Sequence, residues 1–155
     1  MPGPIEIHVT TYGHLPPDIW SRVSPFLPHL HNLTVHWWIQ PHALAWATKL
    51  LDIPAVTVYG ETIVCVPGVL DANGIVRGRL WSWSLPEGLA LWAHEMYHVW
   101  QYRDNPGRFA WSVSSGIVRS LLRGRIYDHT VIEVEQEAIA FERSVCTTLR
   151  NAPRP

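Results

Sequence analysis

Residues 91–101 have the sequence LWAHEMYHVWQ, and this stretch decides how the rest of the chain is interpreted. It contains His94-Glu95-Met96-Tyr97-His98, an H-E-x-x-H motif. Residues four apart lie one turn above each other on a helix, so a helix here would bring both imidazoles to one metal ion. Zinc accepts such nitrogen ligands at about 2.0–2.1 Å. Glu95 projects about 100° round the helix from His94. There it could take a proton from a zinc-bound water and hand it to a leaving amine.

The flanking residues predict that the motif lies on an amphipathic helix. Ser84-Leu85-Pro86-Glu87 is a capping box with an early proline, and it predicts a helix that runs to about Arg103. One side of this helix is apolar and the other carries the motif, so we expect a core side and a histidine side facing a cleft. The apolar side comprises Leu89, Trp92, Met96, Val99 and Trp100, and the other side His94, His98 and Gln101.

Two further helices are predicted after the motif. Asn105-Pro106 can start one that ends near Gly124. Thr130-Val131-Ile132-Glu133 is another possible capping box, which opens a helix over residues 131 to about 149. Its apolar positions define a buried face at about 100° per residue. They are Val131, Val134, Ala138, Ile139, Phe141 and Val145.

The position of each glutamate on this last helix predicts a third metal ligand. Glu135 and Glu142 fall inside the apolar arc, whereas Glu133 and Glu137 fall on the polar side. A carboxylate that faces a core is costly unless it is paired or binds metal, and catalytic zinc sites use three protein ligands plus a water. Glu135 is therefore the predicted third ligand. Glu133 is assigned to the capping box and Glu137 to solvent.

Other side chains are candidates for supporting roles. Glu142 either orients a ligand histidine or pairs with an arginine. Tyr127 and His129 precede the last helix, and either could hold a developing oxyanion or simply pack in place. His29 and His31 are the other close histidine pair, without a partner motif. Residues 62–66 form either an inner strand or an edge strand that pairs with an extended peptide.

The first half of the chain predicts short strands and helices, so the fold class we expect is α+β. A small N-terminal mixed sheet with helices would precede the helical part, in one domain over residues 1–150 with a flexible tail at 151–155. Strands are predicted at 5–11, 33–39, 56–58 and 62–66, helices at 18–26 and 42–51, and a strand or irregular approach at 74–83.

Composition excludes several classes of protein. Hydrophobic residues make up 47% of the 155 residues and charged residues 16%, which is typical of a globular chain. A net charge of -1 gives no basic field for nucleic acid. No apolar run reaches the length of a membrane span, and residues 1–7 show no signal peptide. We therefore expect a cytoplasmic protein with no nucleic-acid or membrane partner, although export by another route stays open. The oligomeric state is not indicated.

The stretch 91–101 resembles the active-site helix of the gluzincin metallopeptidases. More narrowly, it resembles small metallopeptidase domains associated with bacterial contractile injection systems, whose zinc helix is close to L-x-x-H-E-x-x-H-V-x-Q. Those domains later carry E-x-E-A, which is similar to Glu135-Gln136-Glu137-Ala138 here, so the family's ligand falls on Glu135. Residues 59–63, YGETI, are similar to their G-x-x-I strand.

This resemblance covers about residues 55 to 145. It implies a zinc ion, proteolytic hydrolysis and a compact, zincin-like α+β fold. The family's acidic residue after E-x-E-A is replaced by Ile139, and the first 50 residues match none of its motifs, so the resemblance gives no substrate and no role for them.

Together these observations predict a zinc metallopeptidase that hydrolyses peptide bonds in a peptide or protein substrate. Zn²⁺ would be held by His94, His98 and Glu135, with Glu95 as the catalytic base and then acid. Two alternatives stay open. One is a zinc hydrolase of a non-peptide amide or a cell-wall link. The other is a non-catalytic zinc-bearing binding module, against which the presence of Glu95 weighs.

Overall fold

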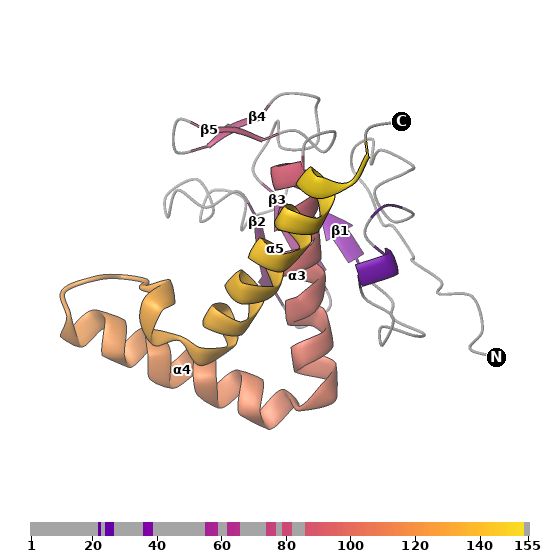
Figure 1. The fold of residues 1–155 in the computed structure, drawn as a ribbon. Coiled ribbons are helices and arrows are strands. Elements are labelled where there is room, and N and C mark those ends of the chain that lie inside the picture. The colour runs from indigo at the N-terminus through magenta and orange to yellow at the C-terminus, as the bar shows by residue number, and fades with distance from the viewer. Residues whose placement is uncertain are drawn as a thin grey trace.

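A computed structural model describes residues 22, 24–26, 36–38, 55–58, 62–65, 74–76, 79–81 and 86–153 (Figure 1). Three long helices form its continuous part: α3 (Pro86–Asp104), α4 (Pro106–Leu122) and α5 (Glu133–Asn151). A 3-10 turn, η2 (His129–Val131), precedes α5, and another, η1 (Ser24–Phe26), lies far upstream. Among these helices, none combines the length and the apolar character that crossing a bilayer requires.

Among the described residues, five short strands precede α3 along the chain. They are β1 (His36–Trp38), β2 (Ala55–Val58), β3 (Thr62–Cys65), β4 (Gly74–Val76) and β5 (Arg79–Trp81). β3 lies between β1, its parallel neighbour, and β2, its antiparallel neighbour, while β4 and β5 pair separately. The inner-strand interpretation of residues 62–66 is therefore confirmed for β3, and the edge-strand alternative is wrong.

The predicted α+β class is wrong for the part of the chain that the structure describes continuously. Residues 86–153 contain helices and turns but no strand, so this fold is helical. The β-branched runs form only three- or four-residue segments in two separate ladders. The long helical patterns after Pro86, by contrast, form the described core, in which Leu89, Trp92, Met96 and Ile132 are among the largest fully buried side chains.

α3 and α5 form an antiparallel pair, with α4 across their base (Figure 1). Arg150 near the end of α5 pairs with Glu87 at the start of α3. At the other end, Gln101 of α3 donates to the backbone oxygen of Val134 at the start of α5. This antiparallel packing brings the middle of α3 opposite the first half of α5, where the predicted ligands lie.

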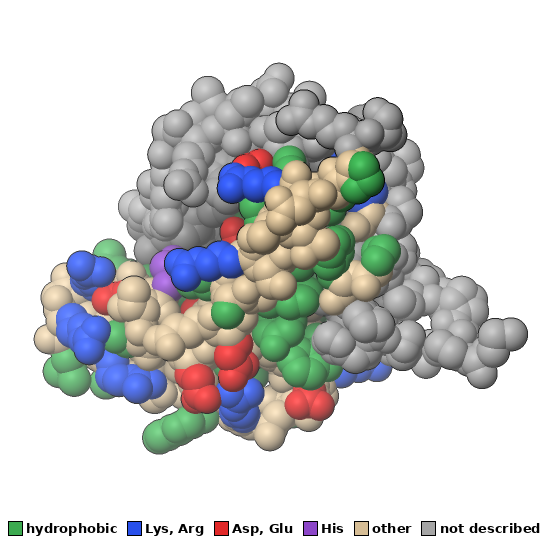
Figure 2. Space-filling view, viewed as in Figure 1, with side chains coloured by type: hydrophobic (Ala, Val, Ile, Leu, Met, Phe, Trp, Pro, Cys, Tyr) green, Lys and Arg blue, Asp and Glu red, His purple; other side chains and the backbone are tan. Residues whose placement is uncertain are grey.

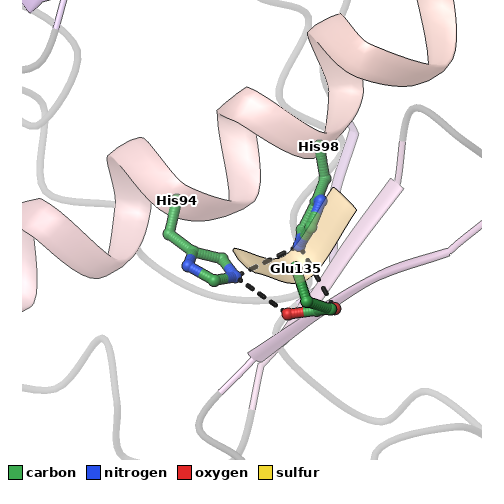
Figure 3. Close-up of side chains that lie close together, drawn as sticks. All are labelled: His94, His98 and Glu135. Carbon is green, nitrogen blue, oxygen red and sulfur yellow. Dashed lines mark hydrogen bonds and ion pairs between the residues drawn. The ribbon is translucent and has the colours of Figure 1, made fainter. Parts of the chain in front are cut away.

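α3 is not amphipathic as predicted, because it is buried on nearly every side. Every residue from Gly88 to Met96 is buried, including the histidine side. Trp100, which was expected on the apolar side, is only half-buried. α3 is thus a central helix, and its motif faces another helix, α5, as Figure 3 also shows.

α4 begins where the sequence predicts and packs through small residues. The side chain of Asn105 accepts a hydrogen bond from the backbone N–H of Arg108 at 2.9 Å, and Pro106 follows as the first helical residue. Gly124, with φ of 72°, adopts the left-handed conformation that ends many helices. The buried residues of α4 are Ser112, Gly116 and Ser120, whereas much of its apolar surface is exposed (Figure 2).

The start of α5 differs from the predicted capping box. Its N-cap is Ile132, with no side-chain cap of its own, and Thr130 belongs to η2, where it bonds to Asp128. Ser112 of α4 takes the place of the cap, because its hydroxyl accepts a hydrogen bond from the backbone N–H of Val134 at 3.1 Å. The first turn of α5 is therefore held by α4, one residue before Glu135.

Several predictions lie outside the described residues. These are the strand at 5–11, most of the helix at 18–26, the helix at 42–51, the capping residue Ser84 and the pair His29 and His31. α5 includes Asn151, the first residue of the predicted tail, and residues 154–155 are outside the description. That the tail is flexible stays a prediction. That residues 1–150 form one domain stays a prediction.

Candidate metal centre

His94, His98 and Glu135 meet between α3 and α5 (Figure 3). The two imidazoles project from the same side of α3, one turn apart, and Glu135 faces them from the first turn of α5. The Nε2 atoms of His94 and His98 are 3.1 Å apart. The carboxylate oxygens of Glu135 lie 3.5 Å from Nε2 of His94 and 3.3 Å from Nε2 of His98. Within the described residues, these three form a group that could hold a metal ion.

These separations fit a tetrahedral zinc site. Ligand atoms at 2.0–2.1 Å from a tetrahedral ion are about 3.3 Å from one another. The three measured separations lie between 3.1 and 3.5 Å. The two distances from Glu135 are to different carboxylate oxygens, and with one ligand atom from each residue all three atoms lie within 4.8 Å of one another. An ion would therefore require a small adjustment of these side chains.

Gln101 fixes the tautomer of His98. Its amide nitrogen donates to the backbone oxygen of Val134 at 3.1 Å and to the Glu137 carboxylate at 2.8 Å, both of which only accept hydrogen bonds. The amide oxygen of Gln101 must then face Nδ1 of His98, 2.8 Å away. Nδ1 therefore carries a proton, and Nε2, on the other side of the ring, faces Glu135.

Glu142 fixes the tautomer of His94 in the same way. Its carboxylate oxygen lies 2.9 Å from Nδ1 of His94, so Nδ1 donates and Nε2 faces the centre of the group. Glu142 is half-buried and lies two turns after Glu135 on α5. Of the two roles left open for Glu142, the structure places it on the histidine. This is the carboxylate–histidine arrangement that commonly orients metal ligands.

The carboxylates and imidazoles of the centre shift one another's pKa values. Burial alone would raise the pKa of the Glu135 carboxyl, but hydrogen bonds with His129, His94 and His98 outweigh it and hold that pKa well below its ordinary value. Burial alone would lower the pKa of His94, yet Glu135 and Glu142 raise it from 6.5 to about 10. Without a metal, a proton on His94 thus supplies the positive charge. A divalent cation would displace that proton.

Tyr127 and His129 contact the predicted third ligand. The Tyr127 hydroxyl donates to one carboxylate oxygen of Glu135 at 2.5 Å, and Nδ1 of His129 lies 3.2 Å from the other. Burial and the negative charge of Glu135 raise the pKa of Tyr127 well above its ordinary value, so its hydroxyl keeps its proton as a donor. Both residues that were candidates for oxyanion binding therefore lie at the centre, against its carboxylate.

Glu95 lies beside the centre but outside the ligand group. It is buried on α3, with 4% of its surface exposed. Its negative charge is among the causes that raise the pKa of His94 and of Tyr127, so its carboxylate is near both groups. A carboxylate beside the ligands is in the region where a general base would work.

The polar chain that supports His98 was not predicted from the sequence. Glu137 was predicted to be a solvated charge, but it accepts from Gln101 and pairs with Arg108 of α4 at 2.5 Å. Arg108 also pairs with Glu133, which was assigned to a capping box. Gln101 had been placed on the histidine side of α3. Its contact with Glu137 depends on how α3, α4 and α5 pack, which the linear sequence did not indicate.

Comparisons with known proteins provide no relative for this chain. No family model matches it, and neither a curated protein nor a solved structure matches it. The functional argument therefore depends on the geometry of the centre.

Proposed function

We propose that this protein is a zinc-dependent metallopeptidase in which His94, His98 and Glu135 hold the ion. The observation that carries the proposal is the convergence of two Nε2 atoms and one buried carboxylate, 3.1–3.5 Å apart. Both Nδ1 atoms are held by acceptors, which leaves both Nε2 atoms to face one point. Three electron-rich groups in a buried site are costly to bring together unless they share a cation.

The donor set favours zinc over the hard divalent cations. Calcium and magnesium take six or more oxygen ligands, whereas two imidazoles and one carboxylate are typical of catalytic zinc. Structural zinc sites are usually closed by four protein ligands. Within the described residues the group has three, which would leave a fourth position for water or substrate.

A bound zinc ion would lower the pKa of its water and polarise a carbonyl group. The residues of this chain would supply proton transfer and orientation. Glu95 would accept the proton of the attacking water and return it to the leaving amine. Glu142 and Gln101 would keep the two histidines in the tautomer that binds metal. Tyr127 and His129, which contact Glu135, would donate hydrogen bonds to a developing oxyanion.

The assignment to gluzincin-type metallopeptidases is part of this proposal. It is supported by a helix that carries H-E-x-x-H and by a glutamate from a later helix at the same centre. The narrower likeness to domains of bacterial contractile injection systems stays a resemblance of motifs, and Ile139 departs from it.

A substitution of the base tests the proposal. Glu95→Gln should retain zinc and lose hydrolysis by at least about a hundredfold, since proton transfer contributes about 10² to 10⁴. A mixed peptide library read by mass spectrometry supplies the substrate, and chelation followed by added zinc should abolish and restore cleavage. Ala140→Gln, an exposed change on α5, is the control. Equal cleavage by Glu95→Gln and the wild type would refute the mechanism.

A non-catalytic zinc module is the second candidate, and the burial of the centre favours it. His94 and Glu135 are each only 8% exposed, so a substrate would have little room in this arrangement. Under this alternative the protein would bind zinc and cut no peptide at any enzyme concentration. In that case Glu95→Gln would change neither zinc content nor any activity.

A further inference from the structure

The outward face of α4 is apolar, although α4 lies at the surface. Trp111 is 75% exposed, Leu122 82% and Val118 56%. Ile117 and Leu121 are exposed on the same helix, and Ile126 follows in the turn after it. One end of α4 projects beyond α3 and α5 (Figure 1). Nothing else in the proposed function explains these side chains.

This face is a continuous stripe without charge. At 100° per residue, the five exposed apolar residues of α4 fall within an arc of about 140°. The other positions in that arc are Gly107, Ala110 and Ser114. The opposite side is the one that packs, through Ser112, Gly116 and Ser120. α4 therefore has two distinct faces, a small-residue face for its own fold and an apolar face that its own fold leaves exposed.

The charges that flank the stripe all have one sign. Between Asn105 and Tyr127 the chain carries four arginines and no aspartate or glutamate. Arg108 pairs with Glu133 and Glu137, and Arg125 pairs with Asp128 at 3.3 Å. Arg119 and Arg123 remain near the exposed end of the helix. Arginine side chains gather beside apolar ones over this end of α4 (Figure 2). A partner for this surface must then be apolar and negatively charged.

That charge pattern argues against a second copy of the chain as the partner. In a two-fold pair of α4 helices the same surface would meet itself, and arginine would lie against arginine. The opposite holds for a membrane with anionic lipids. Helices with an apolar face and arginines beside it lie in the plane of the interface, and arginine can bury its stem while its guanidinium reaches the lipid phosphates.

We propose that the exposed face of α4 docks onto an anionic lipid surface. Trp111, Val118 and Leu122 would enter the boundary between headgroups and acyl chains, and Arg119 and Arg123 would contact phosphates. The helix would lie on the membrane and not cross it, since no described helix is suited to a span. The expectation of no membrane partner was based on the absence of such a span, so it does not address surface binding. The proposal is independent of zinc and of catalysis.

Vesicle flotation with the full chain tests the proposal. Vesicles of phosphatidylcholine alone are compared with vesicles that also contain phosphatidylserine, at low and high salt. The wild type should float with the anionic vesicles, and less so at high salt, because charge attraction is screened. Val118→Gln with Leu122→Gln should weaken the partition at least about tenfold, since two exposed aliphatic side chains can no longer be buried. Arg119→Glu with Arg123→Glu should abolish the preference for anionic vesicles.

The controls separate docking from misfolding and from self-association. Ala140→Gln, exposed on α5, should bind like the wild type. Thermal melts by circular dichroism should match for all variants, and the arginine variant gives a second test should the apolar variant fail to fold. Sedimentation should show a monomer. The proposal is overturned if the wild type does not bind anionic vesicles, if both double variants bind unchanged, or if the α4 face proves to be buried in a dimer.

Discussion

Gln101→Leu tests the most specific geometric argument about the centre. The substitution removes the acceptor of the His98 Nδ1 proton and the donor to the backbone oxygen of Val134. The Val134 oxygen keeps its hydrogen bond within α5, so the group left unpaired is the buried Nδ1 of His98. An unpaired buried polar group costs about 1–3 kcal/mol, and the metal-free protein should lose roughly that much stability. Loss of an outer-shell partner typically lowers metal affinity about 10–100-fold, and we expect a zinc Kd raised by that factor.

A matched variant separates loss of orientation from loss of stability. Ser112→Ala also removes a partner of the Val134 backbone, on the N–H side, without touching His98. It should destabilise the protein by about 1–2 kcal/mol and leave the zinc Kd unchanged. The zinc Kd is measured by competition with a chromophoric chelator, and stability by denaturant unfolding with and without metal. The proposed role of Gln101 is refuted if Gln101→Leu binds zinc as tightly as the wild type. It is also refuted if Ser112→Ala raises the zinc Kd as much as Gln101→Leu does.

Three further results are expected. Glu142→Leu should raise the zinc Kd about 10–100-fold, because it leaves Nδ1 of His94 without its carboxylate partner. Glu133→Gln, an exposed change, should leave the zinc Kd unchanged. Equal Kd values for the two variants would show that Glu142 does not support the centre. Gly116→Ala should destabilise the fold by about 1–3 kcal/mol in denaturant unfolding, because a Cβ there would overlap the side chain of Ile132. An unchanged unfolding midpoint would contradict this packing. Zinc affinity should rise about tenfold per pH unit from pH 7 towards 10, with release of about one proton per ion. The reason is that the pKa of His94 is raised to about 10, so zinc must displace the proton on its imidazole. A zinc affinity that does not change with pH would show that His94 is not a ligand.

The same raised pKa affects the metal-free fold. A histidine whose folded pKa is about 10, against 6.5 when unfolded, contributes stability that is complete below pH 6.5. That contribution is lost as the pH rises from 6.5 towards 10. Zinc should cancel this loss, because the ion replaces the proton on His94.

The parts of the centre that depend on helix periodicity could be predicted from the sequence. His94 and His98 follow from spacing within one helix, and Glu135 follows from the face on which it falls. The face on which a residue lies does not predict which side chains of another helix it will contact. Gln101, Glu137 and Arg108 come from three helices, so their chain of hydrogen bonds depends on tertiary packing.

The errors have equally local causes. Thr130 and Glu133 have the spacing of a capping box, but Asp128 caps η2 first and Ser112 bonds to the start of α5 instead. The α+β class followed from counting strand-like runs, whereas the continuous described fold is made by three long helices, and α3 is buried along most of its length. The polar and apolar residues of α3 follow a pattern that resembles a two-sided helix. Burial on nearly every side does not require such a pattern, so the pattern did not reveal it.

X-ray absorption at the zinc edge tests the central claim most directly. Purified protein loaded with zinc should show one ion per chain, with two imidazole nitrogens and oxygen donors at about 2.0–2.2 Å. His94→Ala and Glu135→Gln should each lose the ion, while Glu133→Gln should keep it. The claim is contradicted if the wild type retains no zinc after incubation, or if the spectrum shows sulfur ligands at about 2.3 Å in place of the two histidines.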